Sequence, residues 1–309
     1  MRIATFNVQN LRLRHPDGGD QLDGARDRDV PEDEGPAAEA LDPVDRRLTA
    51  AVIRDIGADV VALQEVFDTE TFDHFHDRVL LPAEVAPYPH RVCLPGNDGR
   101  GLDVALMSRV PIVEIASHAG LTAGDVGLDP PEGFGSQPVF RRDCLVVDLG
   151  ALILFVCHFK APWPDADAAW PVRRVEAETV RRLVEMRFED PAEAFWLILG
   201  DLNDPDPPGT PGRAIAPFED PFAVDLSLRM ARDERWTFHH PDTGRHSLPD
   251  AILASPRLAA ACPDAVPWVV REGLSLEAGR RAGERLPEVG DHRPHASDHA
   301  ALVVDLPGL

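Results

Sequence analysis

Apolar runs recur along the chain between polar segments, a pattern that predicts buried strands joined by helices and loops. A first strand is expected from Arg2 to Val8. The run DVVALQEV at 59–66 is nearly continuous, as is typical of a strand buried on both faces. Further runs predict strands at 91–95, 102–109, 144–150, 151–159, 195–203, 250–255 and 299–306.

Two segments carry helical spacing instead. One runs from about Pro43 to Ile56, with apolar residues on one face and a stop at Gly57; the other is an Arg- and Glu-rich stretch from Val172 to Phe188. Strands that alternate with helices in both halves favour a layered α/β architecture, with 1–309 forming a single domain. Segments rich in Asp, Gly and Pro predict loop insertions at about 12–45, 120–138 and 271–296.

Polar residues stand where several apolar strands begin or end. Each is weak evidence alone, since a carboxylate after a strand is more often a helix cap or part of a turn. A mixed sheet would gather them at one edge, where carboxylate and amide oxygens suit Mg²⁺ or Mn²⁺ and imidazoles suit proton transfer. These residues are Asn7, Glu65, His158, Asp201, Asn203, Asp250, Asp298 and His299.

The composition limits the classes of substrate that the chain is expected to bind. The 309 residues carry a formal net charge of −22, which repels phosphates at long range and disfavours a broad nucleic-acid surface. A phosphorylated substrate would therefore call for a bound cation. No apolar run is long enough to predict a membrane span. Lys160 is the only lysine and Tyr88 the only tyrosine.

The order of the motifs resembles the endonuclease/exonuclease/phosphatase family, whose deoxyribonuclease I-like fold is a four-layered α/β sandwich, with two mixed sheets packed together and helices outside. The motifs are TFNVQNL at the start, LQEV at 63–66, CHFK at 157–160, GDLND at 200–204, LPDAILAS at 248–255 and SDHAALVV at 297–304. The resemblance runs from residue 2 to 305. It implies an enzyme, a metal-dependent phosphoric ester hydrolase.

The resemblance also implies roles. Asn7, Glu65 and Asp298 would hold the Mg²⁺ or Mn²⁺ cofactor. Asp201 and Asn203 resemble the pair that orients water and phosphate, and His299 the histidine that is paired with a carboxylate, here Asp250. Pro249 and Ala251 depart from the residues that often flank this aspartate in the family.

His158 resembles the histidine of the branch that includes deoxyribonuclease I and the sphingomyelinases, rather than the branch that uses a tyrosine, and is the expected acid for the leaving oxygen. Lys160, two residues later, faces the same side of an extended segment and is a candidate phosphate contact. Arg141, with its neighbour Arg142, is a second candidate to bind phosphate, although surface arginines without such a role are equally common.

The leading hypothesis is a phosphodiesterase of the endo- or exonuclease type. The segment at 236–255, WTFHHPDTGRHSLPDAILAS, resembles nuclease-like members. The acidic composition keeps a phosphatase or phosphodiesterase for small phosphorylated metabolites or lipid head groups as the alternative, and a non-catalytic binding protein as a third. The expected partner is a phosphoester substrate, with nucleic acid among the candidates. No protein partner is inferred, and the absence of a signal peptide predicts a cytoplasmic location.

Overall fold

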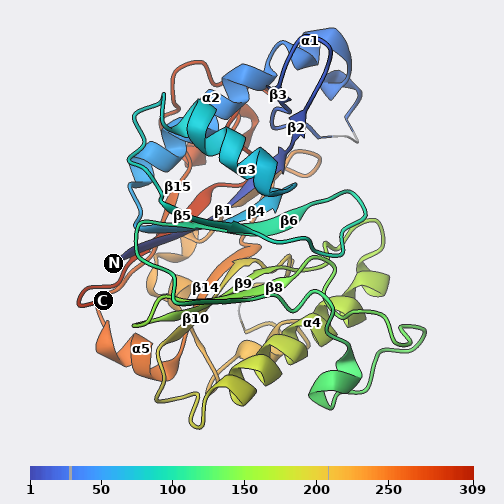
Figure 1. Ribbon diagram of the computed structural model, residues 1–309, viewed down its shortest axis with the longest axis vertical. Coiled ribbons are helices and arrows are strands. Elements are labelled where there is room, and N and C mark those ends of the chain that lie inside the picture. Colours follow the sequence, from blue (N-terminus) through green and yellow to red (C-terminus); the bar gives the residue numbers. More distant parts are fainter. Residues whose placement is uncertain (28–29, 208) are drawn as a thin grey trace.

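The computed structural model describes residues 1–27, 30–207 and 209–309; positions 28 and 29, inside the predicted insertion at 12–45, and position 208 lie outside the described residues. Two six-stranded sheets pack face to face, with α2 and α3 over one and α4 and α5 against the other (Figure 1). The expected four-layered α/β sandwich is confirmed. Within the described residues no helix is both apolar and long enough to cross a bilayer.

The first sheet contains strands from both ends of the chain, β1 and β16, side by side. Its central strand β1 runs parallel to β4 and antiparallel to β16, so the sheet is mixed as expected. Its strands, in spatial order, are β15 (Trp268–Val270), β16 (Ala301–Asp305), β1 (Arg2–Leu11), β4 (Val60–Val66), β6 (Asp103–Ser108) and β5 (His90–Cys93).

The second sheet is also mixed, because β10 runs parallel to β9 and antiparallel to β14. Carboxyl ends of two strands therefore meet the amino end of a third at one edge. The strands, in spatial order, are β11 (Val224–Asp225), β14 (Asp250–Ala254), β10 (Trp196–Asp201), β9 (Ile153–His158), β8 (Cys144–Asp148) and β7 (Glu114–Ala116).

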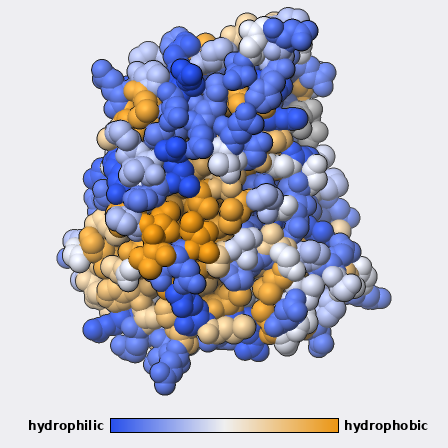
Figure 2. Space-filling view, in the orientation of Figure 1, coloured by the Kyte–Doolittle hydropathy of each residue, from blue (hydrophilic) through white to orange (hydrophobic). Residues whose placement is uncertain are grey.

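The continuous apolar strands bury both faces. Along β9, Leu154 and Val156 enter the core between the sheets, while Phe155 and Cys157 enter the core beneath α4. Successive side chains of a strand point to opposite faces, so both faces must be apolar when both are covered. The space-filling view shows apolar side chains gathered on one face of the molecule (Figure 2).

The expected helices are present, with changed bounds. α2 (Asp42–Ile56) ends at Gly57, whose φ of 58° suits a glycine C-cap. α4 (Ala166–Arg187) begins six residues before the predicted Val172, because Asp165 caps it by accepting the N–H groups of Asp167 and Ala168. The sequence interpretation missed α1 (Gly35–Glu39), α3 (Thr69–Phe75), the π-helix His76–Leu80 and α5 (Pro256–Ala261).

The predicted insertions contain short elements and are not bare loops. The segment 12–45 holds β2 (Leu13–Arg14), β3 (Gln21–Leu22), the 3₁₀ turn Pro31–Asp33, α1 and the start of α2. The insertion at 120–138 holds the 3₁₀ turn Ala123–Val126, and that at 271–296 holds the turns Leu276–Ala278 and Arg280–Ala282.

Between β10 and β14, outside the predicted insertions, lie the 3₁₀ turns Ala216–Phe218, Leu226–Arg229 and Arg232–Glu234 and a hairpin that pairs β12 (Phe238–His240) with β13 (Arg245–Ser247).

A buried ionic cluster fixes the first insertion to the segment before β16. The Arg293 guanidinium contacts the carboxylates of Asp42 and Asp45 and lies 3.5 Å from that of Asp33. Arg46 donates to the carbonyl oxygens of Val8, Gln9 and Gly24. We call Asp33, Asp42, Asp45, Arg46 and Arg293 the α2 clamp.

Candidate active site

The polar residues singled out at the strand ends meet where the edges of the two sheets face one another. Asn7, on β1 of the first sheet, donates its amide N–H groups to Glu65 Oε1 at 3.3 Å and to Asp201 Oδ2 at 3.1 Å. Because Asp201 ends β10 of the second sheet, this one side chain bridges the sheets. The mixed topology thus produces the convergence that the sequence predicted.

A bulge turns Glu65 toward this point. The register between β1 and β4 shifts after Asn7 and Gln64, and Glu65 has a φ of 68°, a left-handed conformation that is costly for a residue with a side chain. Asn10, itself at a φ of 55°, donates its backbone N–H to Glu65 Oε2 at 2.8 Å. The strained backbone aims and holds the carboxylate.

Gly200 allows the two central strands to approach closely beside the site. A Cβ at this position would lie 1.9 Å from the carbonyl oxygen of Cys157, so only glycine fits without a backbone shift. The close pairing places Asp201 opposite His158, and His158 Nε2 lies 3.6 Å from Asp201 Oδ2.

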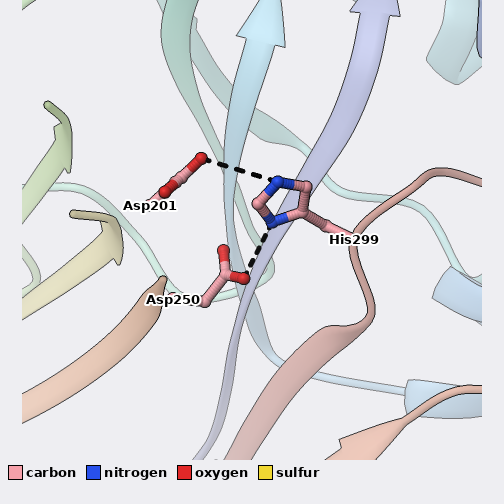
Figure 3. Close-up of side chains that lie close together, drawn as sticks. All are labelled: Asp201, Asp250 and His299. Atoms are coloured by element: carbon pink, nitrogen blue, oxygen red, sulfur yellow. Dashed lines mark hydrogen bonds and ion pairs between the residues drawn. The ribbon is translucent and has the colours of Figure 1, made fainter. Parts of the chain in front are cut away.

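His299 lies between two carboxylates, as Figure 3 shows. Its Nδ1 is 2.9 Å from Asp250 Oδ2, and its Nε2 is 3.8 Å from Asp201 Oδ2. Thr237 donates its hydroxyl to the same oxygen of Asp250. Asp250 Oδ1 is buried and has no hydrogen-bond partner among the described residues. The contact between Asp250 and His299 that the resemblance implies is present, despite the unusual neighbours Pro249 and Ala251.

Burial and mutual charge perturb these groups. Burial raises the pKa of Asp201 to about 7, although His299 acts in the opposite direction. Burial alone would lower the pKa of His299, but the charges of Asp250 and Asp201 raise it well above its usual value. The site therefore confines more negative charge than its own histidine neutralises.

Asp298 lies half-buried on the same side. Its backbone N–H donates to Gln9 Oε1 at 3.0 Å, and the Ser297 hydroxyl lies 3.3 Å from its carboxylate. Burial raises its pKa to about 6; His299 lowers it, while Glu65 and Asp27 raise it further. Asn10, whose backbone N–H holds Glu65, donates its side-chain amide to the carbonyl oxygen of Arg26 at 3.0 Å, so the insertion at 12–45 lies beside the site.

These oxygen donors fit a hard divalent cation. Glu65 and Asp298 repel one another, and among the described residues no lysine or arginine side chain forms an ion pair with either. Amide and carboxylate oxygens are the ligands that Mg²⁺ prefers. Asp201, Asp250 and His299 also offer donor atoms within 4.8 Å of one another, but the hydrogen bond of His299 to Asp250 already occupies one ring nitrogen.

His158 is almost fully buried, and its Nδ1 has no partner among the described residues. Burial, with the nearby Arg142 charge, lowers the pKa of His158 well below its usual value. Its ring is therefore neutral near pH 7 in the free protein. Asn203, at a φ of 52°, lies just beyond Asp201 and donates to the carbonyl oxygen of Phe159 at 3.1 Å.

The two predicted phosphate contacts are not aimed at this cluster. The Lys160 ammonium donates to the carbonyl oxygens of Ala161, at 2.8 Å, and Trp163. The Arg141 guanidinium lies 5.1 Å from the centre of the Phe134 ring. Arg142 is buried and donates to the carbonyl oxygen of Phe159 at 3.0 Å.

Sequence reasoning missed Thr237 and Gln9 as supports of the site. Thr237 holds Asp250, and its carbonyl accepts the Ala300 N–H at 2.7 Å beside His299. Gln9 Oε1 lies 2.9 Å from His295 Nε2 and accepts the Asp298 N–H. Thr237 lies in the recognised segment that begins WTF, and Gln9 lies in TFNVQNL, so the position of each within a recognised motif was the available signal.

Comparison with known proteins places this geometry in context. The model of the Endonuclease/Exonuclease/phosphatase family matches residues 4–299. That span includes every candidate site residue from Asn7 to His299. No curated protein is detectably similar to the chain in sequence.

Solved structures with the same fold have diverse activities in their names. An endonuclease/exonuclease/phosphatase family protein from Leptotrichia buccalis C-1013-b is 16% identical, with 99% of each chain covered and a TM-score of 0.57. A mannosyl-6-phosphatase from Bacteroides thetaiotaomicron VPI-5482 is 15% identical, with 99% of this chain and 98% of the other covered and a TM-score of 0.56.

An AP endonuclease from Archaeoglobus fulgidus is 16% identical, with 99% of each chain covered and a TM-score of 0.54. At such identities the likeness concerns the fold alone, which this chain shares with an endonuclease and with a sugar phosphatase.

Proposed function

The chain belongs to the endonuclease/exonuclease/phosphatase family, a family of divalent-metal-dependent phosphoester hydrolases, and on that premise we propose that it hydrolyses phosphodiester bonds of nucleotides or nucleic acid with Mg²⁺ or Mn²⁺. The observation that carries the proposal is the convergence of Asn7, Glu65, Asp201 and His299 from separate strands. A degenerate binding protein would have no reason to keep so much uncompensated charge together.

Asn7, Glu65 and Asp298 would hold the cation. When bound, it lowers the pKa of a coordinated water and offsets the charge that develops on the phosphate. The same charge would relieve the repulsion that raises the pKa of Asp298. Glu65 is held by the Asn10 N–H and Asp298 by Gln9 and Ser297, so the carboxylates are already placed before a ligand arrives.

Asp201 Oδ2 and His299 Nε2, 3.8 Å apart, would form the pair that accepts the proton of the attacking water. Asp250 orients the imidazole from its other nitrogen and stabilises its positive charge, as a carboxylate beside a catalytic histidine does. Asn203 would direct an amide toward a phosphate oxygen, since its backbone is fixed by the 2.9 Å hydrogen bond from its N–H to Asp201 Oδ1.

For His158 we infer a role other than that of the acid expected from the sequence. With a neutral ring in the free protein, it has an N–H to donate to a non-bridging phosphate oxygen but little driving force to protonate a leaving group. The hydrogen bond would strengthen as charge accumulates on that oxygen, which is a form of electrostatic stabilisation.

The alternative substrate class is a small phosphorylated metabolite or a lipid head group. It is favoured by the net charge of −22, because a small substrate needs no extended basic surface. One hydrolysis panel separates the classes: single- and double-stranded DNA, RNA, nucleotides, sugar phosphates and phospholipid head groups, each with Mg²⁺, Mn²⁺ or EDTA.

The proposal expects metal-dependent cleavage of a nucleotide-containing diester that falls by about a hundred- to ten-thousandfold in His299→Ala. Hydrolysis confined to small phosphomonoesters would replace it with the alternative. Activity that survives in His299→Ala would assign the cleavage to a contaminant, and inactivity on the whole panel would favour a binding protein.

A further inference from the structure

The β12–β13 hairpin, near the start of the recognised segment at 236–255, carries several rings that the proposed reaction does not use. Within the hairpin His239 lies opposite His246. Because alternate residues of a strand point to opposite faces, Phe238 and His240 share one face and His239 lies on the other. The two faces have different surroundings.

The face with His239 and His246 anchors the hairpin to the fold. The centre of the His246 ring lies 4.1 Å from that of Trp236 and 5.1 Å from that of His239, and Trp236 is buried. His246 Nε2 lies 3.3 Å from the carbonyl oxygen of Ala278. These two histidines therefore hold the hairpin against the insertion at 271–296.

The opposite face contacts the candidate active site. The Phe238 ring lies 4.9 Å from the His299 ring, centre to centre, with 50° between the ring planes. Aromatic pairs favour separations of about 4.5–7 Å. The backbones pair too: Phe238 and His299 form an antiparallel bridge, and the Thr237 carbonyl oxygen accepts the Ala300 N–H at 2.7 Å. Main chain and side chain thus fix the contact together.

The Phe238 ring is itself held within the hairpin. The His240 ring lies edge-on to it, at 4.8 Å between centres and 82° between planes. His240 Nε2 is 2.8 Å from Ser247 Oγ, and the Ser247 carbonyl oxygen accepts the Thr237 N–H at 2.9 Å. A series of contacts therefore runs from Ser247 through His240 and Phe238 to the imidazole of the site.

His299 needs such a contact. It lies between Asp250 and Asp201 (Figure 3), yet within the described residues its ring makes one hydrogen bond, at 2.9 Å to Asp250. Its Nε2 is 3.8 Å from Asp201 Oδ2, beyond hydrogen-bond distance. One hydrogen bond fixes one ring atom and leaves the ring plane free to tilt. Catalytic groups must be held within about 10–20° of the productive geometry, so a second constraint is required.

We propose that Phe238 is a positioning residue for His299: its ring packs against the imidazole and sets the plane in which Nε2 faces Asp201 and the attacking water. This inference rests on the proposed function, in which His299 and Asp201 accept the proton of that water. It assigns the hairpin to the rate of the chemical step and not to the affinity for substrate.

The test separates kcat from KM for the substrate that the wild-type protein hydrolyses fastest in the hydrolysis panel. Phe238→Leu removes the ring and keeps an apolar side chain at a half-buried position, so the hairpin should stay folded. We expect kcat to fall about ten- to a hundredfold while KM changes less than about twofold. Phe238→Tyr should retain most of kcat, because its ring still packs on the imidazole.

Phe222→Leu is the matched control. The Phe222 ring lies 5.3 Å from that of Trp196, which begins β10 at the end opposite Asp201. Its loss should lower the free energy of unfolding at least as much as Phe238→Leu does and leave kcat unchanged. This comparison separates positioning of the base from general destabilisation.

A second readout needs no catalysis. In protein with ¹³C-labelled histidine rings and EDTA, the His299 signal is the one that disappears in His299→Ala. We expect its order parameter to fall in Phe238→Leu and to stay at the wild-type value in Phe238→Tyr and Phe222→Leu.

An unchanged kcat in Phe238→Leu, or an unchanged order parameter, would overturn the proposal. A rise in KM at constant kcat would also overturn it, because the hairpin would then bind substrate. If the wild-type protein hydrolyses nothing on the panel, the proposed function fails, and the order parameter still decides whether Phe238 holds the imidazole.

Discussion

Buried carboxylates occur in two regions of the molecule, and their surroundings differ. In the α2 clamp, Asp42 and Asp45 both contact Arg293, and Asp45 also accepts the N–H groups of Ala25 and His295. In the candidate site, Asp201 and Asp250 share one histidine, and Asp250 Oδ1 has no partner in the described part of the chain.

The difference separates a structural device from a functional one. A buried charge is tolerated when opposite charge and hydrogen bonds compensate it within the fold. In the clamp, Arg293 and the adjoining Arg26, which contacts Asp42, offset the carboxylates. The cluster also braces the carboxyl-terminal part of β1 and the segment that leads to Asp298. The site lacks such compensation, and a bound cation would supply it.

Arg293→Met should have the largest effect, because it strips the clamp of its central cation. Removing one partner of a buried ion pair typically lowers the free energy of unfolding by about 3–5 kcal/mol. Urea unfolding measures this loss of free energy of unfolding. Arg47→Met is the matched control, since Arg47, on α2, makes an exposed pair with Glu288 and its loss should cost less than about 1 kcal/mol. Equal losses would remove the distinction between the clamp and the surface.

At the site, Asp201→Asn should lower activity without lowering stability. We expect kcat/KM on a phosphodiester to fall by about a hundred- to ten-thousandfold, because the partner of His299 in proton transfer is lost. The free energy of unfolding without metal should not fall, since a buried, uncompensated carboxylate disappears. Asp233→Asn, on the surface, serves as control for both measurements. A strongly destabilised but active variant would show that Asp201 is a structural residue.

Glu176, on α4, is a buried carboxylate whose surroundings lie between those of the clamp and those of the site, because it has hydrogen bonds from the backbone. It accepts the backbone N–H groups of Arg141 and Lys160, and burial raises its pKa to about 7, above the usual 4.5. Folding therefore favours the protonated form, so its contribution to stability is present below about pH 4.5 and is lost as the pH rises to about 7. The loss amounts to about 3 kcal/mol.

Urea unfolding at pH 5 and at pH 7.5 captures about 2 kcal/mol of this loss, and Glu176→Gln should reduce the pH dependence by that amount. A variant that keeps the wild-type pH dependence would show that Glu176 is ionised at little cost.

Lys160→Met should have the smallest effect. The ammonium binds two carbonyl oxygens of its own turn, so we expect about 1 kcal/mol of lost stability. Hydrolysis of a small phosphodiester should fall by no more than about tenfold, or about 1.4 kcal/mol. A hundredfold loss of kcat with unchanged stability would instead support the phosphate contact expected from the sequence.

The strands, and the meeting of polar residues at the ends of several of them, could be predicted from sequence because both depend on local pattern. Apolar runs in the sequence predict β9 and β10, and Asp201 and His299 lie in motifs a few residues long. The clamp could not be predicted in this way, because Arg293 and Asp45 are 248 positions apart and charged residues in a polar segment normally face water. Thr237 was missed although it and its partner Asp250 both lie in the recognised segment 236–255, because a motif does not state which of its side chains touch.

The distinction between the two regions depends most directly on cation binding. Titrating Mn²⁺ into the wild-type protein by calorimetry, alongside Glu65→Gln and the surface control Asp233→Asn, tests it without any assumption about the substrate. We predict that the wild-type protein and the control bind Mn²⁺ alike, and that Glu65→Gln weakens binding by more than about tenfold. Equal affinity in all three proteins, or no binding by the wild type, would contradict a metal site at Asn7, Glu65 and Asp298.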